Sequence, residues 1–314
     1  MKAVVFDRKS RPDKLVFRDV EKPLPNDDEV LIRVHAVALN AADYRSMKLG
    51  IIPKKKIFGA DIAGRVESAG RNISGFKPGD EVIGDLSDHG FGGLAEYVTV
   101  PEKALIIKPP NVNFEEAAAL PVAALTALQA LRDKAGVKNG HKVLVVGSAG
   151  GVGTFAIQLA KYFGAEATGV CSAKNVLQTT AMGADRAIDY TREDFTQSGI
   201  FYDAILGING NYPLSSYMKC LAPDGTCVIL GGGLSQILKA FFFRWAFSGG
   251  SKKLKFLAAK MNTEDLKFLA GLLESGTIKS VIDRRYPLGE AVEAMNYLKQ
   301  GHAAGKVVIR VAQE

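Results

Sequence analysis

Residues 143–163 read VLVVGSAGGVGTFAIQLAKYF, and this stretch decides the fold class. Val143–Val146 is a continuous apolar run of the kind buried in a parallel sheet, and a helix with one apolar face follows the loop Gly147–Gly153. Glycines here let the backbone turn sharply and approach a pyrophosphate without a Cβ in the way. The first-turn N–H groups of the helix then face the anion. A tight turn without a ligand is the alternative. We predict a dinucleotide-binding loop whose contacts come from Ser148, Gly150, Gly151, Val152 and Gly153.

The segments around this loop alternate between strand and helix patterns. The alternation predicts a doubly wound parallel sheet with helices on both faces. The predicted strands are 143–146, 165–171, 186–189, 202–207 and 225–231, and the predicted helices are 151–163 and 175–182.

The end of the second strand, Val170–Asn175, decides which nucleotide is preferred. Sites for NAD place Asp or Glu there to bind the ribose hydroxyls, whereas this stretch contains no acid. Ser172, Lys174 and Asn175 offer a hydroxyl, an ammonium and an amide, which suit a 2′-phosphate. The alternative, a lysine that merely starts a solvated helix, opposes the helix dipole. We therefore predict NADP(H) as the cofactor.

The first third of the chain has a different sequence pattern. Gly- and Pro-rich turns separate short apolar strands, which predicts an antiparallel, barrel-like β domain. Asn113 is a plausible N-cap for an alanine-rich helix that runs to Arg132 and is broken at Pro121. The last fifty residues lack a sheet of their own, so we expect them to return to this domain. The predicted strands are 2–6, 29–38, 62–69, 81–84, 94–100, 281–284 and 306–311, with helices 263–275 and 288–300.

Composition excludes several classes of protein. The chain has 314 residues, of which 47% are hydrophobic and 23% charged. This composition excludes a disordered, coiled-coil or membrane-spanning protein. Its three cysteines form no CxxC motif, and the N-terminus lacks a signal-peptide core, so we expect a reducing, cytoplasmic location. The net charge of +7 invites a nucleic-acid partner. The basic clusters at 54–56 and 239–260 accompany no recognisable nucleic-acid module, so we expect solvated faces instead.

Three stretches give the chain a family resemblance. Asn40–Asp43 (NAAD), Glu116–Leu131 (EAAALPVAALTALQAL) and His302–Lys306 (HAAGK), together with the glycine loop, resemble the medium-chain dehydrogenase/reductase superfamily. Within it the chain is most similar to the zinc-independent quinone oxidoreductase and enone reductase branch. The resemblance implies an α/β protein with a GroES-like β-barrel catalytic domain at 1–121 and 264–314. It implies a Rossmann NADP-binding domain at 122–263.

The chain departs from the zinc-dependent members of that superfamily. Where they have Gly-His-Glu-x-x-Gly, this chain has Gly59–Gly64 (GADIAG), which lacks the metal-ligating His. No cysteine precedes Cys171, so the four closely spaced cysteines of the structural zinc lobe are missing. The four histidines show no metal-ligand spacing. We therefore expect no metal.

The resemblance places the catalytic residues on the loop after the strand ending at Leu39. It puts Asn40 and Asp43 beside the nicotinamide, although an Asx-type turn cap is an equal reading of Asp43. Arg45 stands where related enone reductases have a lysine, and it or Tyr44 could donate a hydrogen bond to a substrate carbonyl as an enolate develops. A simple surface cation is the alternative for Arg45.

Further cofactor contacts follow from the matched motifs. Thr126 would meet the nicotinamide amide and Tyr190 the adenosine phosphate; an intrahelical hydroxyl and a half-buried strand-end tyrosine are the alternatives. The remaining candidates follow strand ends or match the start of the family's final strand: Ile208, Asn209, Gly231, Gly232, Gly305 and Lys306.

These features predict an NADPH-dependent, metal-free reductase that transfers hydride to quinones or α,β-unsaturated carbonyl compounds, with a small apolar substrate. We expect the aromatic segment 240–247 to line an apolar substrate pocket; a subunit contact, a peripheral membrane contact and an ordinary core helix are the alternatives. An NADPH-binding redox sensor with little turnover and an ordinary alcohol dehydrogenase are the rival functions. The resemblance leaves a homodimer open.

Overall fold

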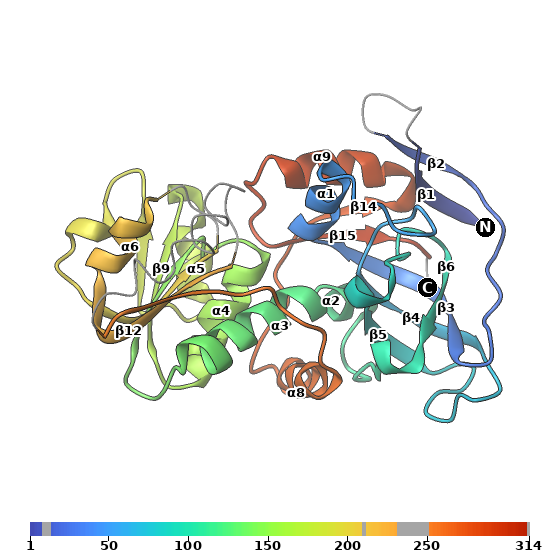
Figure 1. Cartoon of the computed structure of the whole chain (residues 1–314), viewed down its shortest axis with the longest axis horizontal. Helices are drawn as coiled ribbons and strands as arrows, with labels where there is room; N and C mark the ends of the chain where they lie inside the picture. Colours follow the sequence, from blue (N-terminus) through green and yellow to red (C-terminus); the bar gives the residue numbers. More distant parts are fainter. Residues whose placement is uncertain (8–13, 209–211, 231–250, 313–314) are drawn as a thin grey trace. The chain divides into compact units, whose positions relative to one another are not determined.

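The computed structural model describes residues 1–7, 14–208, 212–230 and 251–312 (Figure 1). It divides into two compact units. Unit 1 contains Met1–Leu125 and Lys260–Glu314, and unit 2 contains Thr126–Ala259. The boundaries predicted from the sequence, 121/122 and 263/264, fall within a few residues of these.

Unit 1 is built on a seven-stranded sheet and a separate two-stranded sheet. The large sheet runs in the order β14-β15-β3-β4-β5-β7, and β6 also pairs with β3. All of its pairings are antiparallel except that of β14 with β15. The strands are β1 (Lys2–Phe6), β2 (Leu15–Asp19), β3 (Glu29–Leu39), β4 (Asp61–Ala69), β5 (Glu81–Asp85), β6 (Tyr97–Pro101), β7 (Leu105–Ile107), β14 (Ile282–Pro287) and β15 (Lys306–Arg310).

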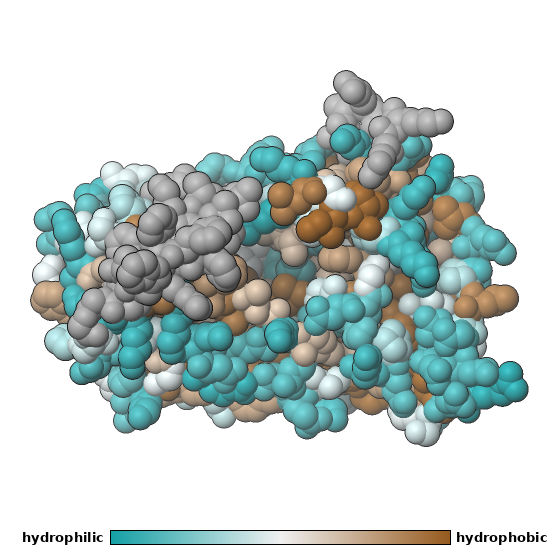
Figure 2. Space-filling view, viewed as in Figure 1, coloured by the Kyte–Doolittle hydropathy of each residue, from teal (hydrophilic) through white to brown (hydrophobic). Residues whose placement is uncertain are grey.

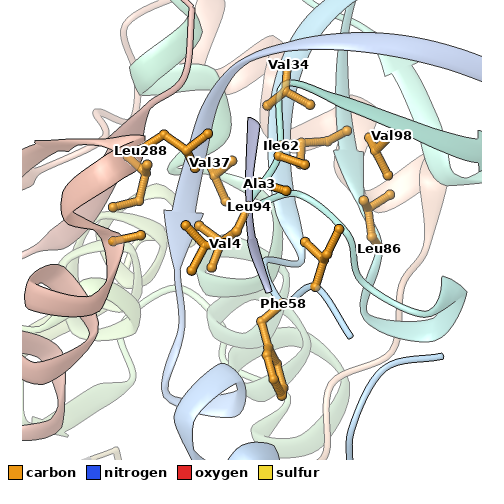
Figure 3. Packing of buried hydrophobic residues seen from close by; sticks show 14 of the residues in the cluster. Ala3, Val4, Val34, Val37, Phe58, Ile62, Leu86, Leu94, Val98 and Leu288 are labelled. Carbon is orange, nitrogen blue, oxygen red and sulfur yellow. The ribbon is translucent and has the colours of Figure 1, made fainter. Parts of the chain in front are cut away.

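The long strand β3 organises this unit. Its edges pair with β4, β6 and β15, and nine of its eleven residues are buried, so side chains on both of its faces are shielded from water. Figure 3 shows side chains of β3 packing with those of neighbouring strands and with Leu288 from the C-terminal segment. The C-terminal segment therefore shares one hydrophobic core with the N-terminal strands.

Short capped helices flank the strands of unit 1. Asn113 caps α2 as predicted, because its side chain accepts a hydrogen bond from the Glu116 N–H at 2.9 Å. Asn262 caps α8 in the same way. The helices of this unit are α1 (Ala41–Lys48), α2 (Phe114–Ala118), α8 (Thr263–Glu274) and α9 (Ala291–Lys299).

Unit 2 is a six-stranded parallel sheet in the order β10-β9-β8-β11-β12-β13. The order reverses between β8 and β11, the place where ligands bind in doubly wound sheets. The strands are β8 (Lys142–Val146), β9 (Glu166–Cys171), β10 (Arg186–Asp189), β11 (Tyr202–Gly207), β12 (Leu221–Ile229) and β13 (Lys253–Phe256). Its helices are α4 (Gly151–Tyr162), α5 (Val176–Ala181) and α6 (Leu214–Lys219), and α3 (Pro121–Gln129) leads into the unit from unit 1.

Several local expectations need correction. The segment after β3 was predicted to be a loop, but residues 41–48 form helix α1. The strand predicted from Leu94 begins at Tyr97, because the Leu94 carbonyl and Ala95 are occupied by β1. Strand β12 starts at Leu221 rather than Gly225, through an irregular register opposite β11. The sequence analysis did not identify β2, β7, β13 and α6, which are short.

Candidate functional site

The glycine loop joins β8 to α4 as the sequence predicts. Gly147 adopts a φ of 93°, which favours glycine, directly after the strand ends. A Cβ on Gly153 would lie 2.1 Å from the Gly147 carbonyl oxygen, so only glycine fits there. At Gly150 the nearest such atom is 3.7 Å away, which leaves open space above the first turn of the helix. This open cradle and the unpaired first-turn N–H groups fit a pyrophosphate.

Ser148 belongs to the inside of this loop rather than to its ligand-facing surface. The residue is 1% exposed, and its hydroxyl lies 3.2 Å from the Val170 carbonyl oxygen and 3.1 Å from the Thr179 hydroxyl. A Cβ on Gly169 would approach the Ser148 hydroxyl to 2.8 Å, so that glycine makes room for it. The Ser148 side chain therefore anchors the loop to β9, and a cofactor contact from this residue stays a prediction.

The polar residues at the end of β9 lie where a nucleotide ribose is bound in such sheets. Lys174 is exposed in a short 3₁₀ turn directly after the strand, and Ser172 and Asn175 are partly exposed. The Asn175 amide donates to the Ser172 hydroxyl at 3.2 Å. After Glu166, the first residue of β9, the chain contains no carboxylate up to the end of α5. This edge therefore suits a phosphate better than a pair of ribose hydroxyls.

In unit 1, the start of α1 holds a buried polar group of side chains. Asn40 precedes the helix and Asp43 occupies its first turn, where a carboxylate is favoured. The Asp43 carboxylate accepts the Asn40 N–H at 2.7 Å and the Gly59 N–H at 3.1 Å. Asp43 is fully buried. Its hydrogen bonds are those of a helix cap, which is one of the two roles predicted for it from the sequence.

Sequence reasoning missed the partner of Asn40. Asp61, at the start of β4, is fully buried and accepts the Asn40 side-chain amide at 2.8 Å. Lys306, at the start of β15, donates to the Asn40 side-chain oxygen at 2.7 Å and to Asp61 at 3.0 Å. A charged residue inside the apolar stretch Phe58–Ala63 was the available signal for Asp61, which the sequence analysis quoted only as part of Gly59–Gly64, in the comparison with the zinc motif.

Burial raises the pKa of two carboxyl groups near this cluster. The pKa of Asp43 rises to about 6, chiefly through desolvation, although the N–H groups of Asn40 and Gly59 act against the shift. Asp85 lies opposite Asp61 in the pairing of β4 with β5, and its pKa also rises to about 6 through desolvation and the nearby Asp61 charge. The cluster thus carries more acid than base, and the solvent does little to screen it.

The remaining residues of α1 are accessible. Tyr44 and Arg45 are partly exposed, and the guanidinium carbon lies 5.9 Å from the Tyr44 ring centroid. Leu49 and Ile51, directly after the helix, are 58% and 59% exposed. Figure 2 shows hydrophobic residues gathered on the part of unit 1 where Figure 1 draws α1. Hydrogen-bond donors therefore lie close to an exposed apolar surface.

The other residues predicted to contact the cofactor come from both units of the chain. Thr126 is partly exposed in α3, and Tyr190 is 49% exposed after β10. Ile208 follows β11 and donates its N–H to the Val146 carbonyl at 3.0 Å, beside the glycine loop. Gly305 has a φ of 135°, and a Cβ there would lie 2.5 Å from the Val281 carbonyl oxygen. Asn209, Gly231, Gly232 and the aromatic segment 240–247 lie outside the described residues.

The described residues do not provide a donor set for a metal ion. Across residues 1–7, 14–208, 212–230 and 251–312, no group of three or more His, Cys, Asp and Glu side chains could hold one. The three cysteines are buried and unpaired, and burial raises the pKa of the Cys220 and Cys227 thiols. These residues do not fit a zinc ion. Over the same residues, no helix is long and apolar enough to cross a membrane.

Comparison with known proteins follows this division of the chain. Residues 26–110 match the family described as alcohol dehydrogenase GroES-like domain, and residues 182–309 match the family described as zinc-binding dehydrogenase. The chain is 36% identical to a chloroplast envelope quinone oxidoreductase homolog of Arabidopsis thaliana, over 92% of each protein. It is 38% identical to 2-methylene-furan-3-one reductase of Solanum lycopersicum, over 93% of this chain and 74% of that protein.

The fold is likewise similar to a solved structure. The quinone oxidoreductase from Coxiella burnetii superposes with a TM-score of 0.87 at 32% sequence identity, over 99% of each chain. The similarity therefore spans both units, including the parallel sheet and the antiparallel strands that carry the clusters described above.

Proposed function

The chain belongs to the medium-chain dehydrogenase/reductase superfamily, among its quinone oxidoreductases and enone reductases, and from this premise we propose that it reduces quinones or α,β-unsaturated carbonyl compounds with NADPH. The observation that carries the proposal is similarity, over more than nine tenths of the chain, to the quinone oxidoreductase homolog of Arabidopsis thaliana and the 2-methylene-furan-3-one reductase of Solanum lycopersicum. The GroES-like unit and the doubly wound unit are those of an oxidoreductase of this superfamily.

The preference for NADPH over NADH rests on unit 2. The first turn of α4 and Gly150 would take the pyrophosphate, and Ser172, Lys174 and Asn175 would take the 2′-phosphate. An ammonium and two uncharged donors stabilise a phosphate, whereas the carboxylate typical of NAD sites would repel it. When bound, NADPH supplies the hydride that the substrate accepts.

Unit 1 supplies the groups that act on the substrate. The partly exposed Tyr44 hydroxyl or Arg45 guanidinium donates a hydrogen bond to the carbonyl oxygen, on which negative charge grows as the β-carbon gains hydride. A proton from solvent or from Tyr44 then completes the α-carbon, so one carbon–carbon double bond becomes a single bond. The apolar surface around Leu49 and Ile51 favours an apolar substrate.

No step needs a metal, and we propose that the enzyme works without one. The carboxylates of Asp43 and Asp61 near the start of α1 already accept hydrogen bonds from Asn40. The described residues offer no set of metal ligands. Zinc at one equivalent per chain, measured by elemental analysis of active enzyme, would contradict this part of the proposal. The cytoplasmic location, the absence of a nucleic-acid partner and the homodimer stay predictions.

A panel of acceptors tests the function directly. We expect NADPH absorbance to fall in the presence of enones, enals or quinones and to stay constant with simple saturated ketones, with NADH clearly slower. Turnover of saturated ketones alone would indicate an alcohol dehydrogenase instead. NADPH binding without turnover of any acceptor would overturn the proposal in favour of a sensor.

A further inference from the structure

We propose that Asp61 and Lys306 are positioning residues that hold the Asn40 side chain, and with it the start of α1, in one orientation for the reaction. This inference rests on the proposed function, because it assigns these two residues a task in that site. Neither residue touches the reacting atoms in this proposal. Both act through Asn40.

The three side chains close a triangle of hydrogen bonds. Lys306 donates to the Asn40 oxygen at 2.7 Å and to an Asp61 oxygen at 3.0 Å, and the Asn40 amide donates to the same Asp61 oxygen at 2.8 Å. A flipped Asn40 would turn its NH₂ toward the ammonium and its oxygen toward the carboxylate. Both contacts would be repulsive, so the ion pair permits a single orientation of the amide.

The same triangle joins distant parts of unit 1. Asn40 begins α1, Asp61 begins β4 and Lys306 begins β15. The second Asp61 oxygen accepts the Val122 N–H at 3.0 Å in the first turn of α3. The start of α1, which carries Tyr44 and Arg45, is therefore tied to two strands and to a second helix through one carboxylate.

Burial argues against a purely stabilising role. The Asp61 side chain is fully buried and that of Lys306 is 3% exposed. A buried ion pair contributes little stability relative to well-packed apolar residues, because both charges lose their water. What such a pair does supply is a defined arrangement of its neighbours, and here the neighbour is Asn40.

The inference changes the role predicted for Lys306 from the sequence. A direct cofactor contact requires an exposed ammonium, whereas this one is buried and holds two hydrogen bonds within unit 1. The two roles differ in outcome. A cofactor ligand affects NADPH affinity when it is removed, while a positioning residue affects turnover.

The double substitution Asp61→Asn/Lys306→Met tests the proposal, because it removes both charges together and leaves neither one buried alone. We expect kcat to fall about 10- to 100-fold and the Kd for NADPH to change less than twofold. The matched control is Glu81→Gln/Lys108→Met. This pair has the same 3.0 Å separation and a lysine side chain that is also 3% exposed, but its carboxylate is 32% exposed and also accepts a hydrogen bond from Arg65. The control likewise removes a buried lysine together with its carboxylate partner, and its kcat should stay within twofold of the parent enzyme.

A readout independent of activity completes the test. The side-chain amide of Asn40, identified in ¹H–¹⁵N spectra by its loss in Asn40→Ser, should be protected from hydrogen exchange in the parent and exchange rapidly in the double variant. An unchanged amide signal, or equal loss of kcat in the control pair, would overturn the positioning role. A weakened NADPH affinity would return Lys306 to the cofactor. If the parent shows no turnover, the proposed function fails, and the amide measurement alone decides whether the pair holds Asn40.

Discussion

At the scale of single residues, two buried carboxyl groups make the stability of unit 1 depend on pH. The folded pKa of Asp85, about 6, exceeds its ordinary value of 3.8 because burial and the nearby Asp61 charge disfavour ionisation. The folded state therefore binds more protons than the unfolded state between about pH 4 and 6. The unfolding free energy should fall as the pH rises through this window. At pH 7 the full cost of ionising the buried Asp85 carboxyl should be present. The raised pKa of Asp43 makes the unfolding free energy depend on pH in the same direction.

Asp85→Asn should therefore stabilise the protein at neutral pH. Ser87 donates both its N–H and its hydroxyl to one Asp85 oxygen, at 2.9 and 2.6 Å, and an asparagine oxygen preserves both bonds. We expect the unfolding free energy to rise by about 1–3 kcal/mol at pH 7 and to change little at pH 4. Urea unfolding at the two pH values measures this. The exposed Asp88→Asn removes only a minor contribution to the raised Asp85 pKa, so it serves as the control and should raise the value at pH 7 by much less than Asp85→Asn does. A loss of stability at pH 7 would contradict the assignment.

Lys174 carries the preference for the phosphorylated cofactor. Lys174→Ala removes one charge-assisted contact to a 2′-phosphate, so the Kd for NADPH should rise roughly 10- to 100-fold while the Kd for NADH changes less than twofold. Fluorescence titration of both cofactors measures the difference. Lys142→Ala removes an exposed lysine at the opposite end of β8 and should affect neither cofactor. Equal losses for NADPH and NADH would refute the role.

At the scale of elements, the loop between β8 and α4 separates two uses of glycine. Gly150 has ordinary extended angles and open space at its Cβ position, whereas a Cβ on Gly153 would collide with the backbone of Gly147 and Ser148. The first glycine keeps room for a ligand. The second permits the close packing of the helix start against the loop.

A pair of substitutions distinguishes these uses. Gly150→Val should leave the melting temperature nearly unchanged and weaken NADPH binding more than tenfold, because the new side chain occupies the cradle. Gly153→Ala should destabilise the fold itself by roughly 2 kcal/mol or more, because backbone atoms must move. Thermal unfolding with and without NADPH measures both effects. Unchanged NADPH affinity in Gly150→Val would remove the loop from the site.

At the scale of the whole molecule, unit 1 is assembled from both ends of the chain. Strand β15 pairs with β3 along Val307–Arg310, and its apolar side chains are buried. The fold of the N-terminal strands therefore depends on residues about 270 positions later in the chain. Unit 2, in contrast, is one continuous segment with a core of its own.

A buried charge in β15 should consequently damage unit 1 selectively. Val308 is fully buried opposite Ala38, so Val308→Asp should destabilise unit 1 by about 3 kcal/mol or more. Hydrogen exchange measured by mass spectrometry should show lost protection in β3 and β4 and retained protection in β8 and β11. Gln300→Asp, which adds the same carboxylate at an exposed position, is the control. Equal loss of protection in both units would contradict this division.

The sequence by itself determined the features that depend on neighbouring residues. Apolar runs and helical periodicity identified the strands and helices around the glycine loop, and the helix break at Pro121 and the cap at Asn113 followed from local chemistry. The acid-free end of β9 could also be read directly. Short segments with little apolar pattern, such as α1, β2 and β13, gave no such signal, because tertiary pairing and capping stabilise them rather than local periodicity.

Only the tertiary structure decided how charges meet. Lys306 and Asp61 lie 245 positions apart, so no spacing rule connects them, and their contact exists because β15 returns beside β3. Ser148 turns inward because Gly169, on the next strand, leaves space for its hydroxyl. Burial itself is a property of the folded chain, and it raises the pKa of Asp43. Sequence patterns are local, whereas desolvation and long-range hydrogen bonds arise only when distant segments pack together.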